Sequence, residues 1–301
     1  MLLLGGSGFL GQALRRYMGD LVATTTHRKS TKPDQKSLPF DAGITTVKSL
    51  IAGLPTKPAA AILLFGVSAI DDCARDPAGT ALVNVARTSQ VIDELRELGI
   101  KPVFISSDAV FDGTKPWRCE EDPAQPILTY GRQKLEVEKR IAALALPWLV
   151  VRLPKLLSED CDSRCMLTGW MNELALKREL RCATDQYFTP AAVTDVAEAI
   201  AELIQGSAHG LFHIGGPDRI SRRELLAAAV EEYAKHQPVR ARITECSIRD
   251  FKFAEARPFD TSLSSERALT LLRTKIRDAR AVARSAVRAC LLGRCGAAPA
   301  K

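Results

Sequence analysis

The feature that most constrains the fold is a cluster of glycines near the start of the chain. Residues 1–18 read MLLLGGSGFLGQALRRYM, a short apolar run followed by glycines at positions 5, 8 and 11 and then by apolar residues at helical intervals. This succession predicts a buried strand, a tight turn and an amphipathic helix. Glycine permits the tight turn because it lacks a Cβ and reaches backbone conformations that other residues avoid.

The three glycines have the spacing GxxGxxG and stand between the expected strand and the expected helix. Glycines in this place let the backbone approach a pyrophosphate, and the N-terminus of the helix offers free N–H groups and a positive dipole end. The motif therefore predicts a dinucleotide-binding turn, with a plain tight turn as the alternative. The residues expected at the dinucleotide are Gly5, Ser7, Gly8, Phe9, Leu10 and Gly11.

Strands and helices continue to alternate over the first half of the chain. The further strands are expected at 21–25, 59–66, 101–106 and 148–153, and the further helices at 83–98 and 130–145. Such alternation favours parallel strands joined by crossover helices. We therefore predict an α/β fold in which residues 1–153 form a doubly wound parallel sheet, a dinucleotide-binding Rossmann domain.

The alternation becomes less regular after residue 153. The expected elements there are helices at 163–179 and 194–205, a strand at 210–216, and a helix that begins at the capping box of Ser221 and Glu224. Residues 240–262 mix charged and aromatic side chains in the manner of a loop. We expect residues 154–272 to form a smaller, loop-rich α/β domain that binds the substrate, although residues 186–216 could return to the main sheet.

The positive charge of the chain is concentrated near its C-terminus. The net charge is +7, and residues 267–301 alone hold nine Lys or Arg and one acidic residue. The arginines that recur every three or four residues are Arg273, Arg277, Arg280, Arg284 and Arg288. We expect residues 273–301 to form a basic helix and tail, which either packs on the domain or docks on an acidic protein partner or a membrane surface. Nucleic acid is disfavoured because no aromatic residues are interleaved.

Composition places the chain among soluble globular proteins. Of its 301 residues, 46% are apolar and 26% are charged, and no apolar run approaches the roughly 18 residues of a transmembrane helix. The N-terminus has neither the basic region nor the cleavage site of a signal peptide, so we expect a cytoplasmic protein. The eight cysteines show no CxxC or His-rich spacing, which predicts reduced thiols and no metal site.

Four more stretches resemble one known family in combination with the glycine motif. They are LVNV around Asn84, VFISSDAVFDG at 103–113, TYGRQK at 129–134 and ARPFDTSL at 256–263. The chain resembles the dTDP-4-dehydrorhamnose reductase family of extended short-chain dehydrogenases over residues 1–272. The resemblance implies an NADP-dependent oxidoreductase that reduces a nucleotide-linked keto-sugar or a similar carbonyl.

The resemblance also implies a catalytic triad of Ser107, Tyr130 and Lys134, with Asn84, Tyr130 and Lys134 near the cofactor. Tyr130 and Lys134 are four residues apart, so they share one face of a helix, where an ammonium can lower the pKa of a phenol. Tyr130 would donate a proton to the carbonyl oxygen, and Ser107 would hydrogen-bond that oxygen. Without the family pattern, a solvated helix face and a turn serine are the alternatives.

The segment TTTHRKS after the second expected strand indicates which cofactor binds. Arg28 and Lys29 could pair with a 2′-phosphate, whereas an acidic residue would be expected for the free hydroxyl of NADH, so NADPH is favoured. Thr26 could add a hydroxyl contact, and the resemblance places Asp41 near the adenine. An exposed basic loop is the alternative.

The substrate half of the chain departs from the family pattern. Ala109 stands where an aromatic residue is common, and residues 152–155, Arg-Leu-Pro-Lys, lack the usual Ser-Trp. The DQ motif is altered at 185–191. Tyr187, Arg257 and the segment 154–170 are the expected substrate contacts, with Arg257 a partner for a diphosphate.

A second function remains open, because the regulatory beta subunit of methionine adenosyltransferase resembles the same reductases and acts by binding a partner. The intact triad favours the enzyme, because a nucleotide-binding interaction module does not need it. The missing tryptophan and the basic C-terminal helix favour the module.

Overall fold

The computed structural model describes residues 1–292 except 22, 28–36, 161–164 and 177–178. Its centre is a seven-stranded sheet in which every pair of neighbours is parallel. The strands in spatial order are β11 (Gly210–His213), β6 (Leu149–Leu153), β5 (Lys101–Ser107), β4 (Ala60–Leu63), β1 (Leu2–Leu4), β2 (Ala23–His27) and β3 (Ser37–Phe40). The order reverses between β1 and β4, which is where open α/β sheets bind their ligands.

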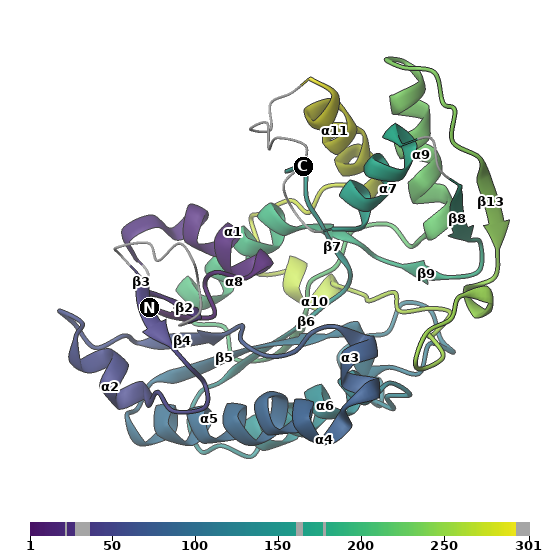
Figure 1. The fold of residues 1–301 in the computed structure, drawn as a ribbon. Helices are drawn as coiled ribbons and strands as arrows, with labels where there is room; N and C mark the ends of the chain where they lie inside the picture. The colour runs from purple at the N-terminus through teal and green to yellow at the C-terminus, as the bar shows by residue number, and fades with distance from the viewer. Residues whose placement is uncertain (22, 28–36, 161–164, 177–178, 293–301) are drawn as a thin grey trace.

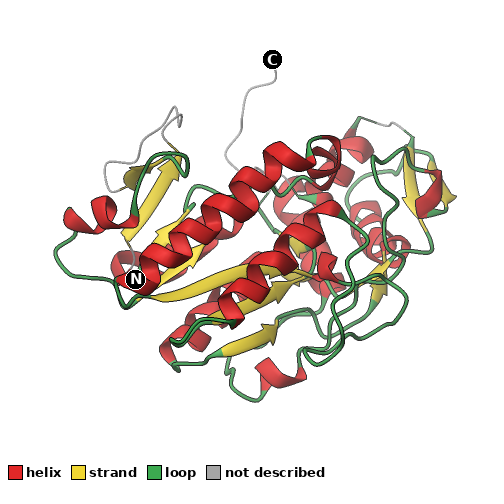
Figure 2. Ribbon diagram, turned by 90° about the horizontal axis from the view of Figure 1, so that it is seen from below, coloured by secondary structure: helices red, strands yellow, loops and turns green. Residues whose placement is uncertain are grey.

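Helices cover both faces of this sheet, as Figures 1 and 2 show. One face packs against α1 (Phe9–Met18) and α8 (Val193–Gln205), and the other against α2 (Val47–Ala52), α5 (Thr88–Glu97) and α6 (Thr129–Ala142). Alternate strand residues supply the two cores, since Leu3 belongs to the first and Leu2 and Leu4 to the second. Their apolar run therefore reflects a strand that is buried on both faces.

A smaller lobe stands beside the carboxyl ends of the strands (Figure 1). Its strands pair as β10 (Ala191–Ala192) with β7 (Leu156–Leu157), β12 (Ile220–Ser221) with β9 (Tyr187–Phe188), and β13 (Ile243–Cys246) with β8 (Leu180–Ala183). Its helices are α7 (Met166–Ala175), α9 (Arg222–Ala234) and α11 (Ala279–Leu291), which share one hydrophobic core. The lobe is thus built partly from residues that precede β11 in the sequence and partly from residues that follow it.

The helix that we expected at 83–98 is divided in the structure. It consists of α4 (Pro77–Ala81), a π-helical turn η2 (Leu82–Arg87) and α5. The remaining short elements are α3 (Ile70–Arg75), α10 (Glu266–Leu269), η1 (Gly19–Leu21), η3 (Asp108–Val110) and η4 (Ile248–Asp250). The wider turn gives Asn84 a place in the wall of the cleft described below.

The basic C-terminal helix is shorter than we expected. Because Asp278 caps α11 by accepting a hydrogen bond from the backbone of Arg280, Arg273 and Arg277 precede the helix, and the prediction of one continuous stripe is wrong. Arg277 instead pairs with Asp195 at 2.8 Å.

The arginines of α11 face acidic residues of α9 in the same chain. Arg280 lies 3.4 Å from Glu224, and Arg288 lies 3.1 Å from Glu232. The opposite side of α11 is buried in the core of the small lobe, as at Val282. Within the described part of the chain, no helix combines the length and the apolar character that crossing a membrane requires.

Candidate active site

A cleft opens at the carboxyl ends of β4, β5 and β6. Its inner part is a cavity of about 340 Å³ bordered by the glycine turn, and its outer part is a cavity of about 420 Å³ bordered by the small lobe. The residues that line both parts are Phe9, Ser68, Ser107, Tyr130, Pro154 and Leu156. The two cavities therefore form one continuous site.

The glycine turn forms the floor of the inner cleft. Gly5 has φ +97°, and a Cβ at Gly11 would lie 2.6 Å from the carbonyl oxygen of Gly5, so neither position accepts a side chain. Gly8 is the N-cap of α1 and offers the helix no side-chain acceptor. This narrow cradle at a helix N-terminus fits the pyrophosphate of a dinucleotide.

Of the six residues predicted at the turn, four line the inner cleft. Gly8, Phe9, Leu10 and Gly11 line the inner cleft, Gly5 forms the bend, and Ser7 is exposed.

Ser107, Tyr130 and Lys134 come together in the wall of the inner cleft. Ser107 is the last residue of β5, and its Oγ donates to Asp108 at 2.8 Å. Tyr130 is in the first turn of α6, and Lys134 follows one turn later, with its Nζ 5.6 Å from the centre of the Tyr130 ring. The same Nζ donates to the backbone oxygen of Ile105 at 2.8 Å.

A close contact between α6 and η3 fixes the distance between Tyr130 and Ser107. A Cβ on Gly131 would lie 1.9 Å from the carbonyl oxygen of Ala109, so the helix backbone rests directly on this carbonyl. Ala109 is itself buried. The glycine after the tyrosine thus lets α6 approach the residues that follow Ser107.

Burial controls the charges of the triad. It lowers the pKa of Lys134 to about 8, an effect that the carboxylate of Glu138 partly offsets. Burial, together with Asp108 and Cys73, raises the pKa of Tyr130 above the ordinary value of a phenol. We expected Lys134 to lower this pKa, and the opposite direction holds because desolvation of the phenolate dominates. The phenol is therefore protonated at neutral pH and can donate its proton.

Asn84 lines the inner cleft, but its amide is held by the protein. Its Oδ1 accepts from the backbone N–H of Val67 at 2.7 Å, and its Nδ2 donates to the oxygen of Val67 at 2.9 Å and to Gln133 Oε1 at 2.7 Å. These bonds tie the loop after β4 to α6. Asn84 consequently orients the wall of the inner cleft.

The residues predicted at the adenosine end lie mostly beyond the described structure. Thr26 belongs to β2 by its backbone, while Arg28 and Lys29 fall outside the described residues. Asp41 follows β3 and accepts a hydrogen bond from the N–H of Gly43 at 2.8 Å. It therefore stands in the turn that leads to α2.

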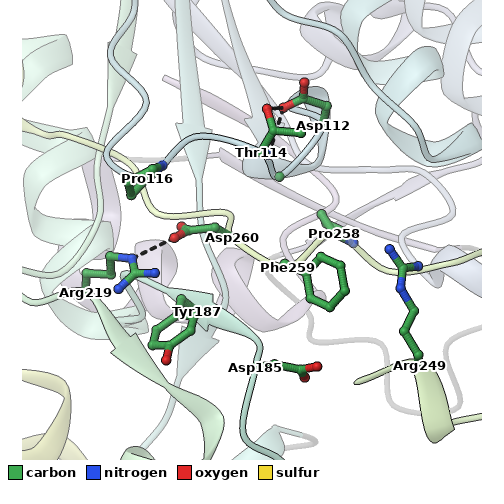
Figure 3. A pocket seen from close by; sticks show the side chains of 11 residues that line it. Asp112, Thr114, Pro116, Asp185, Tyr187, Arg219, Arg249, Pro258, Phe259 and Asp260 are labelled. Carbon is green, nitrogen blue, oxygen red and sulfur yellow. Dashed lines mark hydrogen bonds and ion pairs between the residues drawn. The ribbon is translucent and has the colours of Figure 1, made fainter. Parts of the chain in front are cut away.

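Tyr187 and Arg257, which we both predicted to contact the substrate, do not share a cavity. Arg257 lines the outer cleft and pairs with Asp71 at 2.7 Å. Tyr187 lines a separate pocket of about 510 Å³, where the guanidinium of Arg219 lies 3.8 Å from its ring centre (Figure 3). Because successive strand residues point to opposite faces, Phe188 takes the place in the outer cleft that we assigned to Tyr187.

Several residues of the outer cleft were missed in the sequence. They are Asp108, Gln186 and Arg222, whereas Lys155 belongs to the expected segment 154–170. One signal was available, because Arg222 directly follows the N-cap Ser221. Gln186, from the altered DQ motif, accepts a hydrogen bond from Nε of Arg222 and donates one to the oxygen of Pro258 at 3.2 Å.

Metal ligation finds no support in the described part of the chain. Nowhere in it do three or more His, Cys, Asp or Glu side chains gather in an arrangement that could hold a metal ion.

Comparison with known proteins gives a family match over nearly the whole chain. The model of the RmlD substrate binding domain matches residues 1–291. A dTDP-4-dehydrorhamnose reductase of Sinorhizobium fredii is 23% identical, over 68% of this chain and 72% of the relative. The solved dTDP-4-dehydrorhamnose reductase of Bacillus anthracis in complex with NADP has a TM-score of 0.78 at 20% identity, covering 97% of this chain and 98% of that one.

A second kind of relative matches a shorter region. The beta subunit of methionine adenosyltransferase 2 from Rattus norvegicus is 28% identical over 164 residues, 52% of this chain. The match spans 49% of the subunit, so the chain covers about half the length of this relative.

Proposed function

The chain belongs to the family of the RmlD substrate binding domain, and on this premise we propose that it is an NADPH-dependent reductase of a nucleotide-linked keto-sugar or a similar carbonyl compound. The observation that carries the proposal is that Ser107, Tyr130 and Lys134 line the same cavity as the glycine turn. A phenol, a hydroxyl and an ammonium beside a dinucleotide cradle are the groups that carbonyl reduction requires.

NADPH, when bound, supplies the hydride for this reaction. The chain would supply the proton, because the phenol of Tyr130 is protonated at neutral pH. Ser107 would hydrogen-bond the carbonyl oxygen by turning its hydroxyl hydrogen away from Asp108, which accepts it at 2.8 Å without substrate, and toward the substrate at the boundary of the two cavities. Lys134, charged below about pH 8, would stabilise the negative charge that develops on that oxygen.

The preference for NADPH is supported by Arg28 and Lys29, which follow β2 in the sequence and could pair with a 2′-phosphate. It is also supported by the Bacillus anthracis structure, whose ligand is NADP. We expect NADPH to bind more tightly than NADH in a fluorescence titration.

A nucleotide-binding regulatory module is the second candidate. The 28% identity to the rat beta subunit over half of the chain favours it. Such a module would bind NADPH without oxidising it in the presence of any carbonyl compound, so turnover separates the two candidates.

The decisive experiment compares Tyr130→Phe with the wild type. Oxidation of NADPH is followed at 340 nm with a panel of nucleotide-linked 4-keto-sugars. General acid catalysis contributes about 10²–10⁴-fold, so the variant should lose at least about a hundredfold in kcat while its affinity for NADPH stays within about twofold.

Tyr17→Phe is the matched control, because Tyr17 is 49% exposed and lies away from the cleft on α1. It should behave as the wild type. Turnover that survives in Tyr130→Phe would refute the assignment of Tyr130 as the acid, and wild-type protein that binds NADPH but oxidises none of it would favour the regulatory module.

A further inference from the structure

The outer cleft carries more positive than negative charge. Three cationic side chains line it, those of Lys155, Arg222 and Arg257. Among the described residues that line this cavity, Asp108 is the one with a carboxyl group. The imbalance lies next to the triad, because Ser107 and Tyr130 border the same cavity.

The protein itself neutralises only one of these three cations. Arg257 pairs with Asp71 at 2.7 Å. Arg222 donates through Nε to the neutral side-chain amide of Gln186, and Lys155 forms no ion pair and no side-chain hydrogen bond within the described part of the chain. Neither Lys155 nor Arg222 therefore forms an ion pair with a carboxylate among the described residues, and Asp108 is the one carboxyl group that shares their cavity.

The electrostatic environment agrees with this unbalanced charge. Partial desolvation and then the guanidinium of Arg222 lower the pKa of Lys155, the carboxyl group of Asp108 partly offsets this effect, and the lysine keeps contact with solvent. Burial and the neighbouring Arg257 likewise lower the pKa of Arg222. Burial raises the pKa of Asp108, and hydrogen bonds from Thr261 and Ser107 together with the charge of Lys155 partly offset this effect. Anions bound in the cavity would relieve the repulsion among these cations.

The two uncompensated cations lie on different walls. Lys155 lies just beyond the carboxyl end of β6. It directly follows Pro154, which lines both the inner and the outer cavity. Arg222 begins α9 of the small lobe, where its backbone N–H donates to the oxygen of Gln186 at 3.1 Å. Two anionic groups on one ligand would pair with both cations at the same time.

We propose that the outer cleft selects a substrate with two separate anionic groups, namely a carboxylate on the reacting sugar, held by Lys155, and a diphosphate, held by Arg222. The substrate class is a nucleotide-linked keto-sugar acid. Lys155 is then the residue that distinguishes an acidic sugar from a neutral one. The identity of the reacting carbonyl rests on the reductase function proposed above, whereas the choice between the two kinds of sugar rests on the outer cleft alone.

The test uses ligands that differ in one group. UDP-glucuronate and UDP-glucose differ by a carboxylate in place of a hydroxymethyl group, and the thymidine diphosphate derivatives of the same two sugars form a second pair. Each is titrated calorimetrically into wild type, Lys155→Gln and Arg222→Gln, with and without NADP⁺. A charge-assisted hydrogen bond contributes enough to make wild type bind the acidic member of at least one pair about tenfold more tightly or better.

Lys155→Gln should abolish this preference and leave the affinity for the neutral sugar within about twofold. Arg222→Gln should weaken both members of the pair by a similar factor. Lys48→Gln, an exposed lysine of α2 that does not line the cleft, is the control for charge alone and should keep the preference.

Three outcomes would each overturn the proposal. They are equal affinities of the wild type for both sugars, a preference that persists in Lys155→Gln, and no binding of any of the four ligands. The titration needs no turnover, so it separates the two proposals. A carboxylate preference without NADPH oxidation would remove only the reductase function, and NADPH oxidation without the preference would remove only the role of Lys155.

Discussion

Replacing Gly131 with alanine tests whether the contact between α6 and η3 sets the geometry of the triad. A Cβ at this position would lie 1.9 Å from the carbonyl oxygen of Ala109, whereas ordinary van der Waals contact begins at 3.4 Å. The helix or the carbonyl must therefore move by about 1.5 Å. Since Tyr130 and Lys134 travel with α6 and Ser107 with β5, the displacement separates the phenol from the hydroxyl.

The magnitude follows from two general observations. Overpacking a well-packed site costs about 1–3 kcal/mol of the free energy of unfolding. A displacement on the order of 1 Å in a catalytic site can cost about a hundredfold in rate. We therefore expect Gly131→Ala to lose about 1–3 kcal/mol in urea denaturation and about a hundredfold in kcat/KM. The affinity for NADPH should fall less, because the glycine turn lies on another element.

Gly169→Ala is the matched control. Gly169 is also a helical glycine, in α7, but a Cβ there would meet no atom within 4 Å. This substitution should leave activity unchanged and raise the free energy of unfolding by about 0.5–1 kcal/mol. If Gly131→Ala retained the stability and kcat/KM of the wild type, α6 would not depend on this contact for its position, and the argument would be wrong.

Two further predictions concern charge. Reductase activity should fall as the pH rises through about 8, because Lys134 loses its proton there, and its ordinary value is 10.5. Because the folded-state pKa is the lower one, protonated Lys134 also costs stability, and this cost declines as the pH rises from about 8 towards the ordinary value of 10.5. In a pH–rate profile, Lys134→Arg should lack this alkaline limb; a limb that remained would have another origin. Arg277→Ala removes the ion pairs of Asp195 and Glu159 and should lower the free energy of unfolding by about 1–2 kcal/mol in urea. Arg273→Ala is the control, because the Arg273 side chain is 91% exposed, and it should change this free energy by less than about 0.5 kcal/mol. Equal effects of the two substitutions would contradict the pairing.

The inner cleft can be predicted from the sequence because its parts are local. The strand, turn and helix around Gly8 appear as a change of periodicity over a few residues. Ser107 falls at the end of an apolar run with the composition of a strand, and Tyr130 and Lys134 show helical spacing. Gly8, Ser107 and Tyr130 lie where a strand ends or a helix begins, Lys134 follows one turn into α6, and the parallel sheet brings such boundaries to one edge.

The outer cleft depends on contacts that no local pattern encodes. Lys155 and Arg222 face one cavity only because the tertiary fold brings the start of α9 to the residues that follow β6, and Gln186 holds the guanidinium of Arg222 there. The orientation of Tyr187 is set by the antiparallel pairing of β9 with β12. A shift of one residue in this register would exchange Tyr187 and Phe188 between the two pockets.

The position of β11 has a consequence for the synthesis of the chain. Residues 210–213 form β11, which completes the main sheet beside β6. Much of the small lobe lies between β6 and β11 in the sequence. A ribosome that makes the chain from its N-terminus therefore exposes β6 for some time before its neighbour emerges. During this interval the unpaired edge of Leu149–Leu153 can pair with a strand of another molecule. A nascent chain that stalls between residues 154 and 210 would be a client for chaperones rather than a folded domain.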